Sequence, residues 1–126
     1  SANASNDAPA EGRLVDVGGR RLYIVCQGSG SPVVILQAGL SGTAAGWSRV
    51  AAAVAPSTTV CAYDRAGHGF SDPASAPQDG VAIASDLEIL LDRAAIAGPY
   101  VLVGFSSGGR KSFRDVKSYR RRKRWL

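Results

Sequence analysis

The stretch Tyr100–Gly109 reads Tyr-Val-Leu-Val-Gly-Phe-Ser-Ser-Gly-Gly. Its apolar first half is typical of a strand that is buried on both faces. The strand breaks into a Gly-x-Ser-x-Gly pattern, in which Gly104 and Gly108 flank Ser106 at two positions' distance. Residues without a Cβ allow a sharp turn from strand to helix, which would hold the Ser106 hydroxyl outward beside free backbone amides. The pattern therefore predicts a nucleophile, and an ordinary Gly- and Ser-rich strand–helix connection is the alternative.

Length and composition fit one small globular domain. The chain has 126 residues, of which 45% are hydrophobic, enough for one modest core and too few for two. No apolar run approaches the length of a membrane span. Residues 1–109 hold six basic and nine acidic side chains, whereas residues 110–126 hold nine basic and one acidic. The pI near 9.7 is thus a property of the tail, and the main body is not expected to bind nucleic acid.

The composition divides the chain into a leader, a domain and a tail. Residues 1–11 are small and polar without periodicity, so we expect a disordered leader. Residues 12–109 form the domain, and residues 110–126 form a basic tail. Burying the tail's run Arg120–Arg124 would be costly, so we expect the tail to be non-native sequence that arose from truncation or a frameshift. A basic peptide that binds nucleic acid, anionic lipid or a protein partner is an alternative, and so is a solvated end without function.

Short apolar runs predict the strands that precede Tyr100. Residues 14–17 and 22–26 are joined through Gly18-Gly19, which predicts a β-hairpin. Residues 33–36 form an apolar run without alternation, typical of a central strand, and residues 58–63 predict the next strand.

Two stretches between these strands have the apolar spacing of amphipathic helices. The first is expected to end at Pro56, and the second to begin at the N-cap Asp79 and to close at Gly98 and Pro99. The apolar face of the first is Trp47, Val50, Ala51 and Val54, and that of the second is Ile83, Leu87, Leu90, Leu91, Ala94 and Ala95. Alternating strands and helices predict an α/β fold: a mostly parallel sheet with an N-terminal β-hairpin and flanking helices on both faces.

The two cysteines, Cys26 and Cys61, fall in predicted strands. A free, buried thiol that packs as a small hydrophobic group is the expected role of each. A disulfide between them is the alternative, because two cysteines alone do not make a disulfide framework.

Three segments together resemble the N-terminal portion of the α/β-hydrolase fold family, of the serine hydrolase type. They are the elbow pattern Gly104–Gly108, the loop Tyr63–Asp72, which reads Tyr-Asp-Arg-Ala-Gly-His-Gly-Phe-Ser-Asp, and the strand with its glycine-rich loop Val33–Gly42. The resemblance covers residues 12–109 and implies an incomplete α/β-hydrolase fold.

The resemblance also implies a site. Ser106 would be the nucleophile, and the backbone amides of Ser107 and Leu40 would form the oxyanion hole. The implied reaction is hydrolysis of a small-molecule ester or amide, as in an esterase, lipase or peptidase, and it needs no cofactor and no metal.

The general base is not apparent in this sequence. In the family the order is serine, acid, histidine, whereas the only histidine, His68, precedes Ser106. We therefore expect His68 to be a packed or solvated loop residue, and Asp64 with Arg65 to fix the same loop by hydrogen bonds. The chain alone is expected to be inactive, and a complementing polypeptide that supplies the acid and the histidine is a possible partner.

Overall fold

Five strands and three helical segments make up the part of the chain that the computed structural model describes, which is residues 12–37, 43–74 and 80–104. The strands are β1 (Gly12–Asp16), β2 (Arg21–Gln27), β3 (Val33–Gln37), β4 (Val60–Tyr63) and β5 (Tyr100–Gly104). The helical segments are the 3₁₀ turn η1 (Ala44–Trp47), α2 (Ser48–Val54) and α3 (Gly80–Arg93).

The strands form one mixed sheet in the order β1-β2-β4-β3-β5. The hairpin of β1 and β2 is antiparallel, and β2 also pairs antiparallel with β4. The strand β3 lies between β4 and β5 and runs parallel to both. The predicted α/β architecture, with its N-terminal hairpin and its parallel strands, is confirmed.

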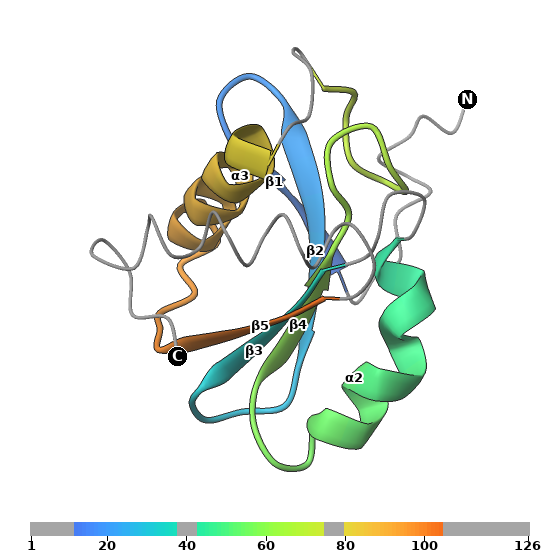
Figure 1. Ribbon diagram of the computed structural model, residues 1–126, viewed down its shortest axis with the longest axis vertical. Helices are drawn as coiled ribbons and strands as arrows, with labels where there is room; N and C mark the ends of the chain where they lie inside the picture. The colour runs from blue at the N-terminus through green and yellow to red at the C-terminus, as the bar shows by residue number, and fades with distance from the viewer. Residues whose placement is uncertain (1–11, 38–42, 75–79, 105–126) are drawn as a thin grey trace.

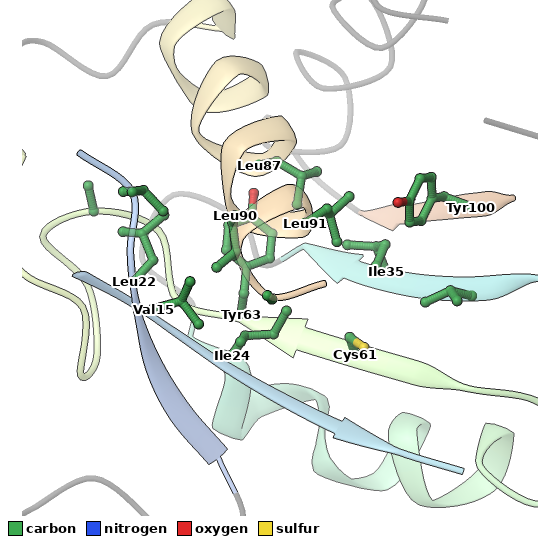
Figure 2. Packing of buried hydrophobic residues seen from close by; sticks show 14 residues of the cluster. Val15, Leu22, Ile24, Ile35, Cys61, Tyr63, Leu87, Leu90, Leu91 and Tyr100 are labelled. Carbon is green, nitrogen blue, oxygen red and sulfur yellow. The ribbon is translucent and has the colours of Figure 1, made fainter. Parts of the chain in front are cut away.

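Helices cover both faces of the sheet, with α3 on one side and α2 on the other (Figure 1). Between the sheet and α3 lies the larger hydrophobic cluster, in which leucines of the helix pack against residues from several strands (Figure 2). Its members include Leu22, Ile24, Ile35, Tyr63, Leu87, Leu90, Leu91 and Tyr100. A smaller cluster on the α2 side includes Tyr23, Leu36, Trp47, Ala51, Val60 and Ala62. Each fully buried large apolar side chain stabilises the fold by about 1.5–3 kcal/mol relative to an exposed one. The core therefore has two sides, and both contribute to stability.

The predicted apolar face of the first helix is wrong at Val50. That side chain is 40% exposed, whereas Trp47 and Ala51 are buried. The helix begins as the 3₁₀ turn η1 before it continues as α2. In that arrangement the buried row runs through Ala44, Trp47 and Ala51, and Val50 lies about 100° around the helix from Ala51.

The end of α3 also differs from the prediction. The helix stops at Arg93 rather than at Gly98, and Ala95 adopts a left-handed conformation with φ of 60°. The amide of Ile96 donates to the Leu91 carbonyl at 3.0 Å, and the amide of Ala95 donates to the Asp92 carbonyl at 3.1 Å. These two bonds are the Schellman pattern, which satisfies carbonyls at a helix end. Ala95 therefore terminates the helix and is exposed, instead of lying on the buried face.

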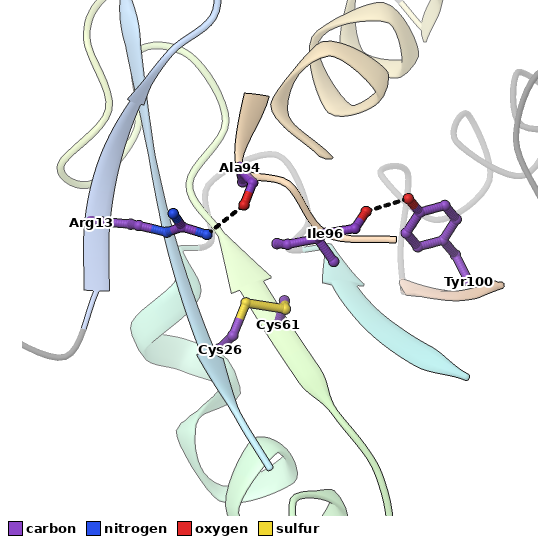
Figure 3. The surroundings of a disulfide bond; sticks show 6 residues. All are labelled: Arg13, Cys26, Cys61, Ala94, Ile96 and Tyr100. Atoms are coloured by element: carbon purple, nitrogen blue, oxygen red, sulfur yellow. Dashed lines mark hydrogen bonds between the residues drawn. A yellow bond between two sulfur atoms is a disulfide. The ribbon is translucent and has the colours of Figure 1, made fainter. Parts of the chain in front are cut away.

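The cysteines are joined, which corrects the expectation of two free buried thiols. Cys26 and Cys61 are register partners on β2 and β4, with 4.0 Å between their Cα atoms, and they form a disulfide (Figure 3). Such a short separation is typical of the close, non-hydrogen-bonded pairs of antiparallel strands. Cys61 is fully buried, but Cys26 is exposed. The two cysteines are therefore joined covalently, and only Cys61 belongs to the core.

Polar contacts fasten the hairpin to α3. The guanidinium of Arg20, in the hairpin turn, forms a bidentate pair with the buried carboxylate of Asp86. Arg13 on β1 donates to the Ala94 carbonyl at 2.7 Å (Figure 3). The antiparallel edge of the sheet is thus tied to the middle of the helix that covers it and to the residue just after the end of that helix.

Several predictions concern parts of the chain that the structure does not describe. The leader at residues 1–11, the N-cap Asp79 and the tail at residues 110–126 all lie outside the described residues. Within the described ranges, no helix combines the length and the apolar character that crossing a membrane requires.

Candidate active site

The carboxyl ends of the three parallel strands are level with one another. Gln37, the last residue of β3, is in register with Tyr63 at the end of β4 and with Gly104 at the end of β5. The chain therefore leaves all three strands at one edge of the sheet, which is where open α/β sheets bind ligands.

The loop after β4 is held together by its own backbone. The amide of Gly67 donates to the Asp72 carbonyl at 2.8 Å, and the amide of Ser71 donates to the His68 carbonyl at 3.0 Å. The Ser71 hydroxyl accepts the amide of Tyr23 at 2.8 Å and donates to the Asp64 carbonyl. The loop is thus fastened to β2 as well as to itself.

Asp64 is the hydrogen-bonding centre of this loop. Its side chain is buried at 1% exposure, and its backbone amide donates to the Tyr23 carbonyl at 3.0 Å. Its Oδ1 accepts the amide of Ala44 at 2.6 Å, and its Oδ2 accepts the amide of Phe70 at 2.9 Å. One carboxylate therefore joins the segment that follows β3 to the loop that follows β4.

Gly69 gives this carboxylate the space that it needs. A Cβ at position 69 would lie 2.1 Å from Oδ2 of Asp64, and the φ of Gly69 is +52°. Both the contact and the left-handed backbone favour glycine at this position.

A second carboxylate fixes the far end of the loop. Asp72 accepts the backbone amide of Arg21 at 2.7 Å and the Nε of the same residue at 3.2 Å. The hydrogen bonds from the Arg21 side chain hold the pKa of Asp72 below its usual range. This pair lies nearer the surface than Asp64 does.

The sequence of the chain matches one protein family over most of its length. Residues 32–114 match the family model for the alpha/beta hydrolase fold. The chain belongs to the α/β-hydrolase fold family. The sequence-based resemblance is thereby confirmed.

Solved structures agree with this assignment. The crystal structure of E-2-(acetamidomethylene)succinate hydrolase is 29% identical with a TM-score of 0.76, over 86% of this chain and 40% of that chain. A bromoperoxidase from Bacillus anthracis is 26% identical with a TM-score of 0.75, again over 86% and 40%. An epoxide hydrolase, CorEH, is 25% identical with a TM-score of 0.78, over 90% of this chain and 39% of that chain. This chain thus spans about 40% of the length of these solved structures.

A curated relative extends much further than this chain. It is the probable transporter efuK of Hormonema carpetanum, which is 36% identical over 102 residues, or 76% of this chain and 15% of that protein.

The three residues predicted to form the hydrolase site, Ser106, Ser107 and Leu40, lie outside the described residues. The structure does place the positions that precede them. Gly104 comes two residues before Ser106 and is in register with Gln37, which comes three residues before Leu40. The strand ends that precede the predicted nucleophile and the two predicted oxyanion amides are therefore adjacent.

His68 and Tyr63 lie close to this edge, and the surroundings of each indicate a structural role. His68 is half-buried in the loop, with its Nδ1 3.2 Å from the Ala66 carbonyl, as expected for a loop residue. Tyr63 points into the core on the α3 side, and burial raises the pKa of its hydroxyl far above the usual value. That hydroxyl stays protonated at neutral pH and is not a general base.

Sequence reasoning missed two features of this edge. It expected Asp64 and Arg65 to fix this loop as a hydrogen-bonding pair, but it did not predict that the Asp64 carboxylate also accepts the amide of Ala44, 20 residues earlier. It also gave no role to Gln37, which is fully buried at the end of β3. A signal for Asp64 was present in the nearby glycine at position 69, but no local pattern indicates a partner in another segment.

Proposed function

We propose that this chain carries the nucleophile and the oxyanion-binding amides of a serine hydrolase that acts on a small ester or amide. The observation that carries the proposal is the register of Gly104 with Gln37 at the carboxyl edge of the sheet. The Gly-x-Ser-x-Gly pattern begins at that Gly104, which is where a nucleophile elbow requires its strand to end.

In the proposed reaction, Oγ of Ser106 attacks the carbonyl carbon of the substrate and a general base takes the hydroxyl proton. The backbone amides of Leu40 and Ser107 stabilise the negative charge on the former carbonyl oxygen. Collapse of this intermediate expels the alcohol or amine and leaves an acyl group on Ser106, which water then removes. The neighbours include a hydrolase of a succinate derivative, an epoxide hydrolase and a bromoperoxidase, so the fold alone does not select the chemistry. The serine at position 106 is what favours acyl transfer.

We propose further that these 126 residues alone turn over little substrate. After Ser106 the sequence contains Asp115 and no histidine. Without a base the serine hydroxyl stays protonated and reacts slowly, and the oxyanion amides supply only a residual effect. The acid and the histidine would then come from elsewhere in a complete form or from a complementing polypeptide.

A fluorophosphonate probe tests the nucleophile. The chain is incubated with the probe for minutes and for many hours, digested, and analysed by peptide mass spectrometry. We expect slow labelling at Ser106 that is abolished in Ser106→Ala and retained in Ser107→Ala, the matched control one residue away. The absence of labelling above the Ser106→Ala background after the long incubation would refute the nucleophile. Fast stoichiometric labelling would instead refute the lack of a base.

The charge distribution favours one other function, which is binding through the tail. Residues 110–126 carry nine basic side chains and one acidic side chain, a composition suited to nucleic acid, anionic lipid or an acidic protein partner. In this alternative the domain is an inactive scaffold. Binding to DNA or to anionic vesicles that weakens with salt and disappears when residues 110–126 are deleted would support it, and no binding at low salt would eliminate it.

A further inference from the structure

A cavity lies between β2 and the helical segment η1–α2, which stands on one face of the sheet (Figure 1). Its volume is about 320 Å³. The residues that η1 and α2 contribute to its lining have no side chain larger than that of serine. They are Ala44, Ala45, Ser48 and Ala51. Side chains of this size leave the space above β2 unfilled, although protein cores rarely contain voids larger than a water molecule.

The cavity follows β2 along the sheet. Tyr23, Val25 and Gln27 line it, and because they alternate along the strand they share one face. The Tyr23 carbonyl accepts the amide of Asp64, just after β4, whereas Gln27 is in register with Val60 at the start of β4. The strands β4 and β3 lie between β2 and β5. The cavity is therefore on the α2 face of the sheet and not at the end of β5.

The lining changes from exposed to buried residues. Gln27, Ala45 and Ser48 are exposed and lie at the mouth, whereas Ala51 and Ala62 are buried and lie deeper. A small molecule can therefore enter while the domain stays folded.

Asp64 is the only charged residue among the described residues that line the cavity. It is 1% exposed and forms no ion pair in the described part of the chain. Its two oxygens accept the amides of Ala44 and Phe70, which also line the cavity. An ionised carboxylate has about four acceptor positions, so these two amides leave part of its capacity unused. The cavity thus combines apolar walls with a buried negative charge.

We propose that this cavity binds a small organic cation in which an ammonium or amidinium group is attached to one apolar ring. The positive group pairs with the Asp64 carboxylate, where burial limits screening by water and salt. The rings of Tyr23 and Phe70, with centroids 5.2 Å apart, supply an aromatic wall that attracts both a cation and an apolar body.

The size of the cavity limits the ligand to one ring with a short arm. Its volume of about 320 Å³ is roughly twice the ~150 Å³ of a cavity that holds benzene. An anion is disfavoured because none of the described lining residues is basic. The inference does not rest on the proposed hydrolase function, since it uses neither the nucleophile nor the oxyanion amides.

Similar small molecules separate charge from shape. Benzylammonium carries the positive group, benzyl alcohol is neutral, and benzoate is negative. Each is titrated into the full chain, and amide chemical shifts are followed by two-dimensional NMR. We expect benzylammonium to bind at least about tenfold more tightly than benzyl alcohol, and benzoate to show no saturable binding. The shifts should be largest at Ala44, Ala51 and Phe70.

Two variants test the cavity and its charge, each with a matched control. Ser48→Phe fills the mouth from an exposed position and should weaken benzylammonium binding by at least about tenfold. Val50→Phe adds the same bulk to an exposed position of α2 outside the cavity and should change nothing. Asp64→Asn should lower the affinity for benzylammonium to that for benzyl alcohol. Asp72→Asn, which removes a carboxylate of the same loop outside the cavity, should leave both affinities unchanged.

Several results would overturn the proposal. Equal binding of benzylammonium and benzyl alcohol would mean that the Asp64 charge selects no ligand, and so would tighter binding of benzoate. Benzylammonium binding that survives Ser48→Phe would place the ligand elsewhere. The absence of saturable benzylammonium binding at millimolar concentrations would mean that the cavity is not a cation site. If Asp64→Asn does not fold, the comparison of the three molecules and the Ser48→Phe result still decide.

Discussion

Breaking the Cys26–Cys61 disulfide should lower stability substantially without destroying the fold. The bond links β2 to β4 across 35 residues of sequence. For a loop of that length, the loss of unfolded-chain entropy is about 12.7 cal/mol/K, which stabilises the folded state by about 3.8 kcal/mol at 25 °C. Small domains have a total stability of only about 5–15 kcal/mol. The strand pairing of β2 with β4 and the two-sided core remain after reduction, so we expect a folded but much weaker domain.

Urea unfolding followed by far-ultraviolet circular dichroism measures this loss. With a slope of about 2 kcal/mol/M, typical of a small domain, the midpoint should fall by about 2 M urea when dithiothreitol is added. The variant Cys26→Ser with Cys61→Ala tests the same loss without reductant. Serine suits the exposed position 26, and alanine suits the buried position 61.

Two results would refute this reasoning. If thiol titration of the unfolded, unreduced chain finds two free thiols, the bond is not formed. If the bond is present but the unfolding curves coincide with and without reductant, under conditions where both thiols are shown to be free after reduction, closure of the 35-residue loop does not stabilise the domain.

Three further predictions concern single contacts. Ala95→Gly should raise the free energy of unfolding by about 1 kcal/mol, because φ of 60° is unfavourable for alanine. The control Ala97→Gly, on the exposed segment that follows, should not raise it. Urea unfolding midpoints compare the two variants. The lowered pKa of Asp72, caused by its arginine partner, means that its stabilisation is present above the unfolded pKa of about 3.9 and is lost as the pH falls through the lower folded value. Below pH 4, the stability of Asp72→Asn should therefore depend less on pH than the stability of the unmodified chain, which urea unfolding at several pH values measures. An equal dependence on pH in the two proteins would contradict this. A double-mutant cycle with Arg20→Ala and Asp86→Ala should give a coupling energy of about 2 kcal/mol, because Asp86 is buried, and a value near zero would mean that the pair does not fasten the hairpin to α3.

The fold was largely predictable because its signals are local. Apolar runs and turn glycines lie within a few residues of one another, so each strand and helix could be found without knowledge of its neighbours. Burial of Val50 was mispredicted because the 3₁₀ turn shifts the buried row by a fraction of a turn. The first residue of that turn, Ala44, is held by Asp64, which lies 20 residues further along the chain.

The contacts that were missed are non-local. Cys26 and Cys61 meet because β2 pairs with β4 rather than with the next strand in sequence. Asp64 meets Ala44 because β3 and β4 are adjacent and parallel. Strand order and register decide both pairs, and neither follows from the spacing of residues along the chain. For the proposed hydrolase site, the sequence predicted the pattern at Ser106, whereas only the structure shows that the preceding strand end, Gly104, is in register with Gln37.

The position of the proposed nucleophile depends on how Tyr100 packs at the opposite end of β5. Its ring lies in the cluster beneath α3, and its hydroxyl donates to the Ile96 carbonyl, just after that helix (Figure 3). A slip of β5 by one residue would turn Tyr100 to the other face of the sheet and move Gly104 by about 3.3 Å along β3. The anchored ring therefore sets where β5 ends along β3, at Gly104. If the proposed function holds, Tyr100→Ala should slow the fluorophosphonate reaction at Ser106 through geometry alone, because Tyr100 is the first residue of β5 and lies four residues before Gly104.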